Sequence, residues 1–307
     1  MLCEHKAMDL LQLRYFQAVA RHQHVSRAAA ELRVAQPALS RAIARLEAEL
    51  GVPLFDRRGR RVRLNRFGVM FLARAGRALD ELDQGQREVR DAAGLAQGTV
   101  AVAAETLRTL SGLVAGFLAG HPGVSFRLFQ SPAPAMAAQL QAGEVDLCLA
   151  SQPLPGPALA SAELLSEEVL LAVPPSHRLA GRTRVTVSVD GGELAGEPFV
   201  TTRPGYWQRA LTDRLFTYAV IVCEGDEPYA IRGLISAGVG IGLMPAMARQ
   251  LAPDPPVGWL HLDAPHLDVP CRRTLSLVWR ADAYRPAAAR ALTEFAAGYF
   301  RTWRGDA

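Results

Sequence analysis

The sequence predicts an α/β protein in which a small helix-rich head precedes a longer α/β body. Residues 25–50 read as two short amphipathic helices joined by a tight turn, and an arginine-rich run follows them. From residue 99 onward, continuous apolar segments alternate with helical ones, which is typical of a mostly parallel sheet with helices on both faces. At 307 residues the chain exceeds one ordinary domain, so two or three units are expected.

The first predicted helix runs from residue 9 to residue 21. Its apolar stripe should pack on the two helices that follow and complete their core, and it consists of Leu10, Leu13, Phe16 and Val19 or Ala20. Ser26 is a suitable N-cap for the second helix. The third helix is expected to open at Gln36-Pro37 and to stop at Gly51.

The third helix has two different faces. Leu39, Ile43, Leu46 and Leu50 share the apolar one, and the opposite face carries Pro37, Arg41, Ala44 and Arg45. Arginines flanked by small residues suit a helix that lies in the major groove of DNA. The alternative is an ordinary amphipathic surface helix.

The run from residue 57 to residue 66 is strongly basic. It has no acidic residue, and its arginines are Arg57, Arg58, Arg60, Arg61, Arg63 and Arg66. Gly59 supplies a turn, and Val62 and Leu64 alternate with arginines as in a half-buried strand. This pattern predicts a β-wing that follows a phosphate backbone, against the alternatives of a solvated surface or a disordered tail.

Three segments resemble LysR-type transcriptional regulators, and the resemblance covers essentially the whole chain. They are QLRYFQAVA (12–20), SRAAAELRVAQPALSRAIARLEAELGVPLFDRRGRRVRL (26–64) and the looser GVGIGLMP (238–245). The resemblance implies a winged helix-turn-helix DNA-binding domain at 1–65, a linker helix at 66–94 and an effector-binding domain at 95–307. It also implies that the last has the two-lobed type II periplasmic-binding-protein fold, with lobe I at about 95–174 and 273–307 and lobe II at about 175–272.

The same resemblance nominates DNA-contacting residues. Base readers are expected at Gln36, Pro37, Ser40, Arg41 and Arg45. Contacts to DNA phosphates are expected from Ser26 and Arg27 and from the wing arginines Arg57, Arg58, Arg60, Arg61 and Arg63. Ala35 departs from the serine common in the family, so one N-cap contact is in question.

The distribution of charge agrees with a nucleic-acid-binding head. Residues 1–79 carry 15 Lys and Arg against 6 Asp and Glu, whereas the rest of the chain carries 19 against 24. A basic head on a mildly acidic body indicates that only the head meets a polyanion.

A long helix is predicted from about residue 66 to residue 93, with Asn65 as its cap. Its weak apolar stripe, interrupted by Gly85, consists of Leu72, Ala75, Leu79, Leu82, Gln86, Val89 and Ala93. The resemblance implies that this helix pairs with its twin in a homodimer or homotetramer. The alternative is that it docks on its own C-terminal domain.

The body is expected to form two lobes with two crossovers. Predicted strands of the first are 99–104, 124–130, 145–150 and 168–173, with helices at 106–120 and 133–142 and a proline-rich connector at 151–165. The second lobe has predicted strands at 199–201 and 220–223 and one ending at Pro245, with helices at 206–218 and 228–237. The chain then returns through a strand at 273–279 and closes with a helix at 286–302.

Ligands of such sheets bind at the carboxyl ends of strands, in the crevice between lobes. This rule nominates Glu105, Thr106, Gln130, Ser131, Ser151, Thr201, Thr202, Arg203 and Glu224. Hydroxyls at helix N-termini and Arg203 favour a carboxylate, so an organic acid or amino acid is the expected effector. Glu105 would repel an anion; it either caps its helix or faces an effector that carries an amine. The alternative for each residue is an ordinary N-cap or turn position.

Other classes of protein find less support. Gly238, Gly240 and Gly242 form GxGxG, but they follow a helix and precede a strand, the reverse of a dinucleotide site. No GxSxG, HExxH or phosphate-binding GxxxxGK[ST] occurs, so an enzyme is not expected.

Four cysteines without CxxC spacing, and histidines without partner ligands, predict neither a metal nor a cofactor. No signal peptide or membrane span is predicted, which favours the cytoplasm over a transport role.

The sequence therefore predicts a sequence-specific transcriptional regulator that binds a double-stranded DNA operator and responds to a small-molecule effector between two lobes. RNA polymerase is a possible further partner. The rival hypothesis is a cytoplasmic ligand-binding α/β protein or enzyme whose basic head binds nucleic acid non-specifically. The operator, the effector, and the choice between activation and repression are left open.

Overall fold

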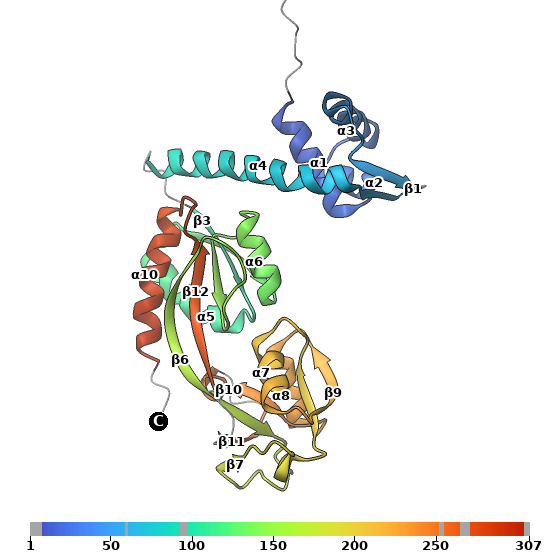
Figure 1. The fold of residues 1–307 in the computed structure, drawn as a ribbon. Coiled ribbons are helices and arrows are strands. Elements are labelled where there is room, and N and C mark those ends of the chain that lie inside the picture. Colours follow the sequence, from blue (N-terminus) through green and yellow to red (C-terminus); the bar gives the residue numbers. More distant parts are fainter. Residues whose placement is uncertain (1–7, 59–60, 93–97, 252–254, 265–270, 304–307) are drawn as a thin grey trace, which may run out of the picture. The chain divides into compact units, whose positions relative to one another are not determined.

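A computed structural model describes residues 8–58, 61–92, 98–251, 255–264 and 271–303 of the chain. Internal contacts divide the chain into two compact units, Met1–Val89 and Arg90–Ala307. Each unit has its own elements and its own apolar core, and each is described separately below (Figure 1).

Unit 1 combines helices with a short hairpin. Its elements are α1 (Leu10–His22), α2 (Val25–Leu32), α3 (Gln36–Leu50), β1 (Phe55–Arg58), β2 (Arg61–Leu64) and most of α4 (Arg66–Ala92). Strands β1 and β2 pair antiparallel, with Phe55 opposite Leu64. The backbone N–H of Val62 donates to the carbonyl of Gln23, which fastens the hairpin to the end of α1.

Helix ends in unit 1 follow the expected chemistry with one correction. Asp9 caps α1 in a reciprocal capping box with Gln12, and the side chain of Asn65 accepts from the first turn of α4. The prediction that Ser26 caps α2 is wrong: the helix already begins at Val25, and His24 is the N-cap without a side-chain hydrogen bond. Ala35 likewise caps α3 without any side-chain bond.

The apolar faces of α1 and α3 meet in the core of unit 1. Phe16 is completely buried and lies against Phe55 of the hairpin and Phe71 of α4. Leu39, Ile43 and Leu46 of α3 are buried around it, as their spacing predicts. Burial of these side chains fixes which face of α3 points outward.

The predicted stripe of α4 splits into two parts. Ala75 and Leu79 are buried in the core of unit 1, and Leu72 packs at its edge. Leu82 and Val89 are exposed within the described part of the chain. The N-terminal part of this helix thus belongs to the core, while Leu82 and Val89 in the later part are left exposed by the described residues of unit 1.

Unit 2 begins with a parallel β-α-β-α-β segment that forms lobe I. Its elements are β3 (Thr99–Ala104), α5 (Arg108–Gly120), β4 (Ser125–Gln130), α6 (Ala133–Gln141) and β5 (Leu147–Ala150). Strand β3 lies between β4 and β5 and is parallel to both. All the predicted elements of this segment are present, with ends that differ by up to two residues.

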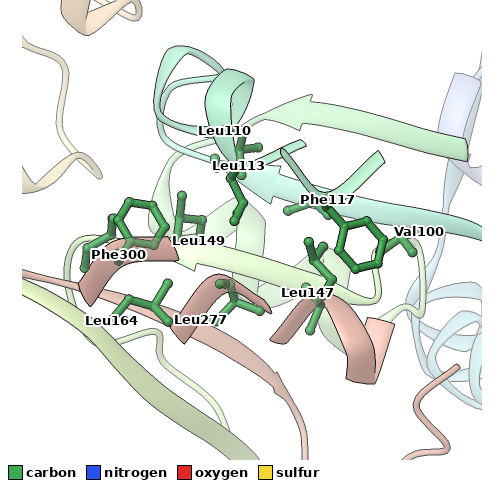
Figure 2. Close-up of a cluster of buried hydrophobic side chains, with 14 of the residues drawn as sticks. Val100, Leu110, Leu113, Phe117, Leu147, Leu149, Leu164, Leu277 and Phe300 are labelled. Atoms are coloured by element: carbon green, nitrogen blue, oxygen red, sulfur yellow. The ribbon is translucent and has the colours of Figure 1, made fainter. Parts of the chain in front are cut away.

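The core of lobe I is a set of aliphatic and aromatic side chains between the sheet and two helices (Figure 2). Phe117 of α5 and Phe300 of α10 (Ala287–Arg301) lie on opposite sides of Leu147 and Leu149 in the labelled view. Val100 and Leu277 complete this layer from two further strands. A second cluster around Met136 packs α6 on the other face of the sheet.

Two long strands join the lobes. In β6 (Leu159–Val173), residues 159–168 pair antiparallel with β12 (Arg272–Arg280), and residues 169–173 pair with strands of lobe II. The predicted connector at 151–165 is therefore wrong in its second half. Proline and glycine before residue 158 suggested a loop, but the residues from Leu159 onward form a strand that pairs with β12 along most of its length, with one shift of register.

Lobe II contains the remaining elements of the fold. They are β7 (Arg184–Thr186), η1 (Gly192–Leu194), β8 (Pro198–Thr202), α7 (Trp207–Leu215), β9 (Val220–Gly225), α8 (Pro228–Ser236), β10 (Gly242–Pro245), α9 (Ala248–Leu251) and β11 (Gly258–Asp263). Strands β8 and β9 are parallel, whereas β10 and β11 are antiparallel to β6. Strands β7 and β11 were not predicted.

The main sheet is mixed, which corrects the prediction of a mostly parallel one. Its strand order is β4-β3-β5-β12-β6-β11-β7, with β10 also on β6, and β12 is antiparallel to both neighbours. The β6–β12 pair is antiparallel because the chain crosses from lobe I to lobe II along β6 and returns along β12. None of the described helices has the length and apolar character that crossing a membrane would require.

Candidate functional site

The outward face of α3 carries the residues nominated to read bases. Gln36, Pro37, Arg41 and Arg45 are exposed, and Ser40 is half-buried. The side-chain amide of Gln36 donates to Ser40 Oγ at 3.2 Å, and Arg41 Nε donates to the carbonyl of Pro37 at 3.3 Å. These local bonds hold both side chains along the helix surface, where a groove edge would meet them.

Helix α2, which carries two of the residues predicted to contact phosphates, packs against α3. Ser26 and Arg27 are exposed in the first turn of α2, which has no side-chain cap, so its N–H groups are available to an anion. Arg63 is exposed on β2. Arg60 lies outside the described residues. The backbone of Arg57, Arg58 and Arg61 belongs to the hairpin, while their side chains lie outside the description.

Two arginines of unit 1 that are not predicted to contact DNA form ion pairs within the unit. Arg14 pairs with Asp83 and Arg21 pairs with Glu31. Among the residues described, Arg27, Arg45 and Arg63 have no acidic partner within 4.0 Å. None of the described acids of unit 1 therefore neutralises their positive charge, as is expected of a surface that binds a polyanion.

Unit 2 contains a small interlobe cavity of about 20 Å³, which has room for about one water molecule. It lies where both crossover strands pass between the lobes. Side chains from both lobes and from β12 form its wall, namely Ala104, Glu105, Thr106, Thr109, Leu149, Ser151, Trp207, Gln208, Pro228, Tyr229, Met244, Pro245, Ala248, Arg273 and Leu275.

Glu105 is 3% exposed at the end of β3. It does not cap the helix that follows it; its Oε1 instead accepts from the backbone N–H of Trp207, the first residue of α7 in the other lobe, at 3.3 Å. Gln152 Nε2 donates to the same oxygen at 3.4 Å. Burial raises the pKa of the Glu105 carboxyl, while Ser151, Arg273 and the Trp207 N–H oppose that rise.

Arg273 is the buried cation at the cavity. Its Nε lies 2.7 Å from Oε1 of Glu167, and the same carboxylate accepts from the N–H of Met247 at 2.6 Å. Arg273 also donates to Ser151 Oγ at 3.3 Å and lies over the ring of Trp207. This network neutralises the guanidinium and holds it between strands and lobe II.

Gln208 follows Trp207 on α7 and is 2% exposed. Its Nε2 donates to the carbonyl of Leu243 at 3.2 Å, which identifies its Oε1 as the acceptor. That Oε1 is buried, and no hydrogen-bond partner for it exists in the described part of the chain. Tyr229 closes another wall, and burial raises the pKa of its hydroxyl.

The structure brings together three of the nominated effector residues, Glu105, Thr106 and Ser151, at the interlobe cavity. Gln130 and Arg203 line a separate hollow of about 520 Å³, where Arg203 forms a two-pronged ion pair with Asp226. Neither cavity is lined by the other four nominees, Ser131, Thr201, Thr202 and Glu224. Of these, Thr201 bonds Thr212 and Glu224 pairs with Arg209.

Four important residues of the cavity were missed: Trp207, Gln208, Tyr229 and Arg273. The strand-end rule stops at the loop after each strand, whereas Trp207, Gln208 and Tyr229 stand in the first turns of α7 and α8. A signal for Arg273 did exist. It shares its strand face with Leu275 and Leu277, which places a charged side chain on an otherwise buried face.

Two families match the chain and together cover nearly all of it. Residues 10–69 match the family described as bacterial regulatory helix-turn-helix protein, lysR family. Residues 93–301 match the LysR substrate binding domain.

Curated relatives and solved structures give the same result. An uncharacterized HTH-type transcriptional regulator of Bacillus subtilis (strain 168), YybE, is 40% identical over 245 residues, 78% of this chain and 82% of its own. The transcriptional dual regulator GltC of the same organism is 34% identical over 247 residues, covering 78% and 81% of the two chains. The structure of a full-length OxyR variant from Pseudomonas aeruginosa matches with a TM-score of 0.69 at 24% identity over 96% and 95% of the chains. Full-length CbnR complexed with its target DNA matches with a TM-score of 0.66 at 23% identity over 94% and 99%. At these identities the two structures establish the shared fold.

Proposed function

We propose that two sites carry the function of this chain, which belongs to the LysR family of DNA-binding transcriptional regulators with an effector-binding domain. Unit 1 binds an operator with α3 in the major groove and the β1–β2 wing on the backbone. A small-molecule effector binds between the lobes of unit 2. Because the target is DNA, the proposed place of action is the cytoplasm.

The observation that supports the DNA site best is the exposed, unneutralised face of α3. Its other face is buried by Leu39, Ile43 and Leu46, so Arg41 and Arg45 are held outward by the core. Uncapped N-termini of α2 and α3 add N–H donors that suit phosphates near Ser26 and Gln36. Arg45 is proposed as a base reader and Arg63 as a backbone contact.

Replacing Arg45 by alanine is expected to weaken binding to a specific operator by about 1–3 kcal/mol, with a smaller loss on random DNA. Fluorescence anisotropy measures both affinities, on a fragment selected by the protein from a random pool and on a shuffled fragment of the same composition. Arg301, exposed near the end of α10, provides the matched control Arg301→Ala. An equal loss on the two fragments would assign Arg45 to phosphate contact.

Replacing Arg63 by alanine is expected to weaken binding to all DNA alike. The slope of log affinity against log salt concentration should fall by about one unit, because one phosphate contact is lost. Affinities measured across a salt titration check this for wild type, Arg63→Ala and Arg301→Ala. A slope identical to that of wild type would remove β2 from the interface.

The effector site is proposed at the interlobe cavity because buried polar groups of both lobes converge there. The present cavity holds about one water, so a metabolite enters only when the lobes separate about β6 and β12. A wider groove of about 550 Å³ shares Ser151, Trp207 and Arg273 with the cavity and offers an approach to it. The proposed class of effector is an organic acid or an amino acid.

Helix α4 is proposed to mediate the assembly of two or more copies of the protein. Its later part exposes Leu82 and Val89, seven residues apart on one helix, and a second copy of the helix would cover such a stripe. The regulator is therefore proposed to act as a homodimer or a homotetramer, with RNA polymerase as a further partner at the promoter.

A further inference from the structure

Two hydrogen-bond acceptors at the interlobe cavity lack donors. Glu105 Oε2 and Gln208 Oε1 are both buried, and neither has a partner among the residues that the structure describes. Both residues line the same cavity of about 20 Å³ and are 3% and 2% exposed. Ser151 is the group of the chain that favours the ionised form of Glu105 most, but its hydroxyl also accepts from Arg273. A buried acceptor without a donor is destabilising, so a donor from outside the chain would stabilise this pair.

The position that an anionic ligand would take is already occupied by the protein. The N-terminus of α7 points N–H groups toward lobe I, and Glu105 Oε1 accepts the first of them, from Trp207. A carboxylate from the effector would have to displace Glu105 or lie beside it. The chain's own acid thus removes one of the main attractions for an organic acid.

The arginine side chains near the cavity already interact with other groups of the protein. Arg273 is neutralised by Glu167, and Arg203 pairs with Asp226 at the separate hollow. Arg108 is exposed and lies over the ring of Tyr229, 4.9 Å from its centroid, but it does not line the cavity. With the Arg273–Glu167 pair counted as neutral, the carboxyl of Glu105 leaves the cavity with an excess of acceptors and negative charge. A positively charged donor balances both.

We propose that the interlobe cavity binds the ammonium group of a small amine or amino acid, with Glu105 Oε2 and Gln208 Oε1 as its acceptors. The inference rests on the proposed function, in which an effector binds between the lobes, and it narrows the class of that effector. Trp207, Tyr229 and Met244 supply apolar wall for the carbon skeleton of the ligand. The ammonium binds Glu105 in its ionised form, and binding therefore opposes the rise in the carboxyl pKa that burial causes.

The test compares ligands that share a skeleton but differ in charge. Full-length wild type is titrated at millimolar concentration with benzylamine, phenylacetate, benzyl alcohol and L-phenylalanine, and its thermal midpoint is followed by tryptophan fluorescence. Benzylamine and L-phenylalanine are expected to raise the midpoint in a saturable way, because a ligand that binds only the folded state stabilises it. Phenylacetate and benzyl alcohol are expected to have no comparable effect.

The variant Glu105→Gln tests how much the negative charge of the carboxylate contributes to amine binding. The amide keeps the shape of the side chain and avoids the burial of a charge, so the variant is expected to fold with a midpoint at or above that of wild type. Amine affinity should fall about tenfold or more, since the charge-assisted bond is lost. Glu294→Gln, at an exposed acid on α10, is the matched control and should keep the wild-type response.

The outcomes distinguish two conclusions: that the ligand carries an amine, and that it binds between the lobes. Equal amine affinity in wild type and Glu105→Gln, or no amine response in wild type, would overturn the amine assignment. Stabilisation by phenylacetate that is lost in Tyr229→Leu would overturn it too, but would leave an effector site between the lobes. A saturable response to any probe that survives both Glu105→Gln and Tyr229→Leu would place the ligand elsewhere and remove the proposed effector site as well.

Discussion

Replacing Arg273 by methionine is expected to lower the free energy of unfolding of unit 2 by about 3–5 kcal/mol. The side chains of Arg273 and Glu167 are only 5% and 3% exposed, so removal of the guanidinium leaves a buried carboxylate without its cation. The same substitution breaks the bond to Ser151 and the contact over Trp207. Glu105 also loses a positive charge that helps it to ionise.

Urea denaturation followed by tryptophan fluorescence measures this loss in the full chain. The protein has four tryptophans, Trp207, Trp259, Trp279 and Trp303, and all of them belong to unit 2. Their signal therefore reports the unfolding of unit 2 without the head. Arg184→Met is the control, because its ion pair with Asp263 is 64% and 43% exposed and should contribute no more than about 1 kcal/mol.

The double variant Arg273→Met/Glu167→Leu tests the cause. If the loss comes from an uncompensated buried charge, removing both partners should recover part of the stability that the single variant loses. A double variant that loses as much as the two single variants added together would instead show that packing around Arg273, and not the isolated charge, carries the effect.

The sequence predicted the helices of the head and the parallel half of lobe I because their signals are local. Apolar spacing along 36–50 fixes the buried face of α3, and continuous apolar runs mark β3 and β5. It predicted β12 and the end of β6, but it missed the first part of β6 and the antiparallel pairing of these two strands, whose paired residues are more than a hundred positions apart. Pairing of Glu168 with Arg272 cannot be inferred from either segment alone.

The residues that line the interlobe cavity were only partly predictable for a related reason. Strand ends led to Glu105, Thr106 and Ser151, but the orientation of α7 and α8 brought Gln208 and Tyr229 to them. The same rule led to Arg203, whose charge is neutralised by Asp226 in the turn before α8. Strand order shows where loops gather, whereas the pairing of side chains within that region depends on three-dimensional packing.

Replacing Phe16 by alanine is expected to destabilise unit 1 by about 3–5 kcal/mol. Phe16 is completely buried, and its ring centroid lies 5.4 Å from that of Phe55 and 5.3 Å from that of Phe71. The substitution therefore opens a cavity where α1, the wing and α4 meet. A small unit has about 5–15 kcal/mol of stability in total, so specific DNA binding should be lost or strongly weakened near physiological temperature.

The two units should respond separately because each has its own core. The tryptophan-monitored transition of Phe16→Ala should keep the wild-type midpoint, while far-UV circular dichroism shows an earlier loss of helix and anisotropy shows loss of DNA binding. Leu11→Ala removes an apolar side chain from the same helix at a position that is 53% exposed, and it should change the stability of unit 1 by about 0.5 kcal/mol or less. A tryptophan midpoint that falls together with the head would contradict independent cores. It would mean that the stability of unit 2 depends on unit 1 as well as on the Arg273 network.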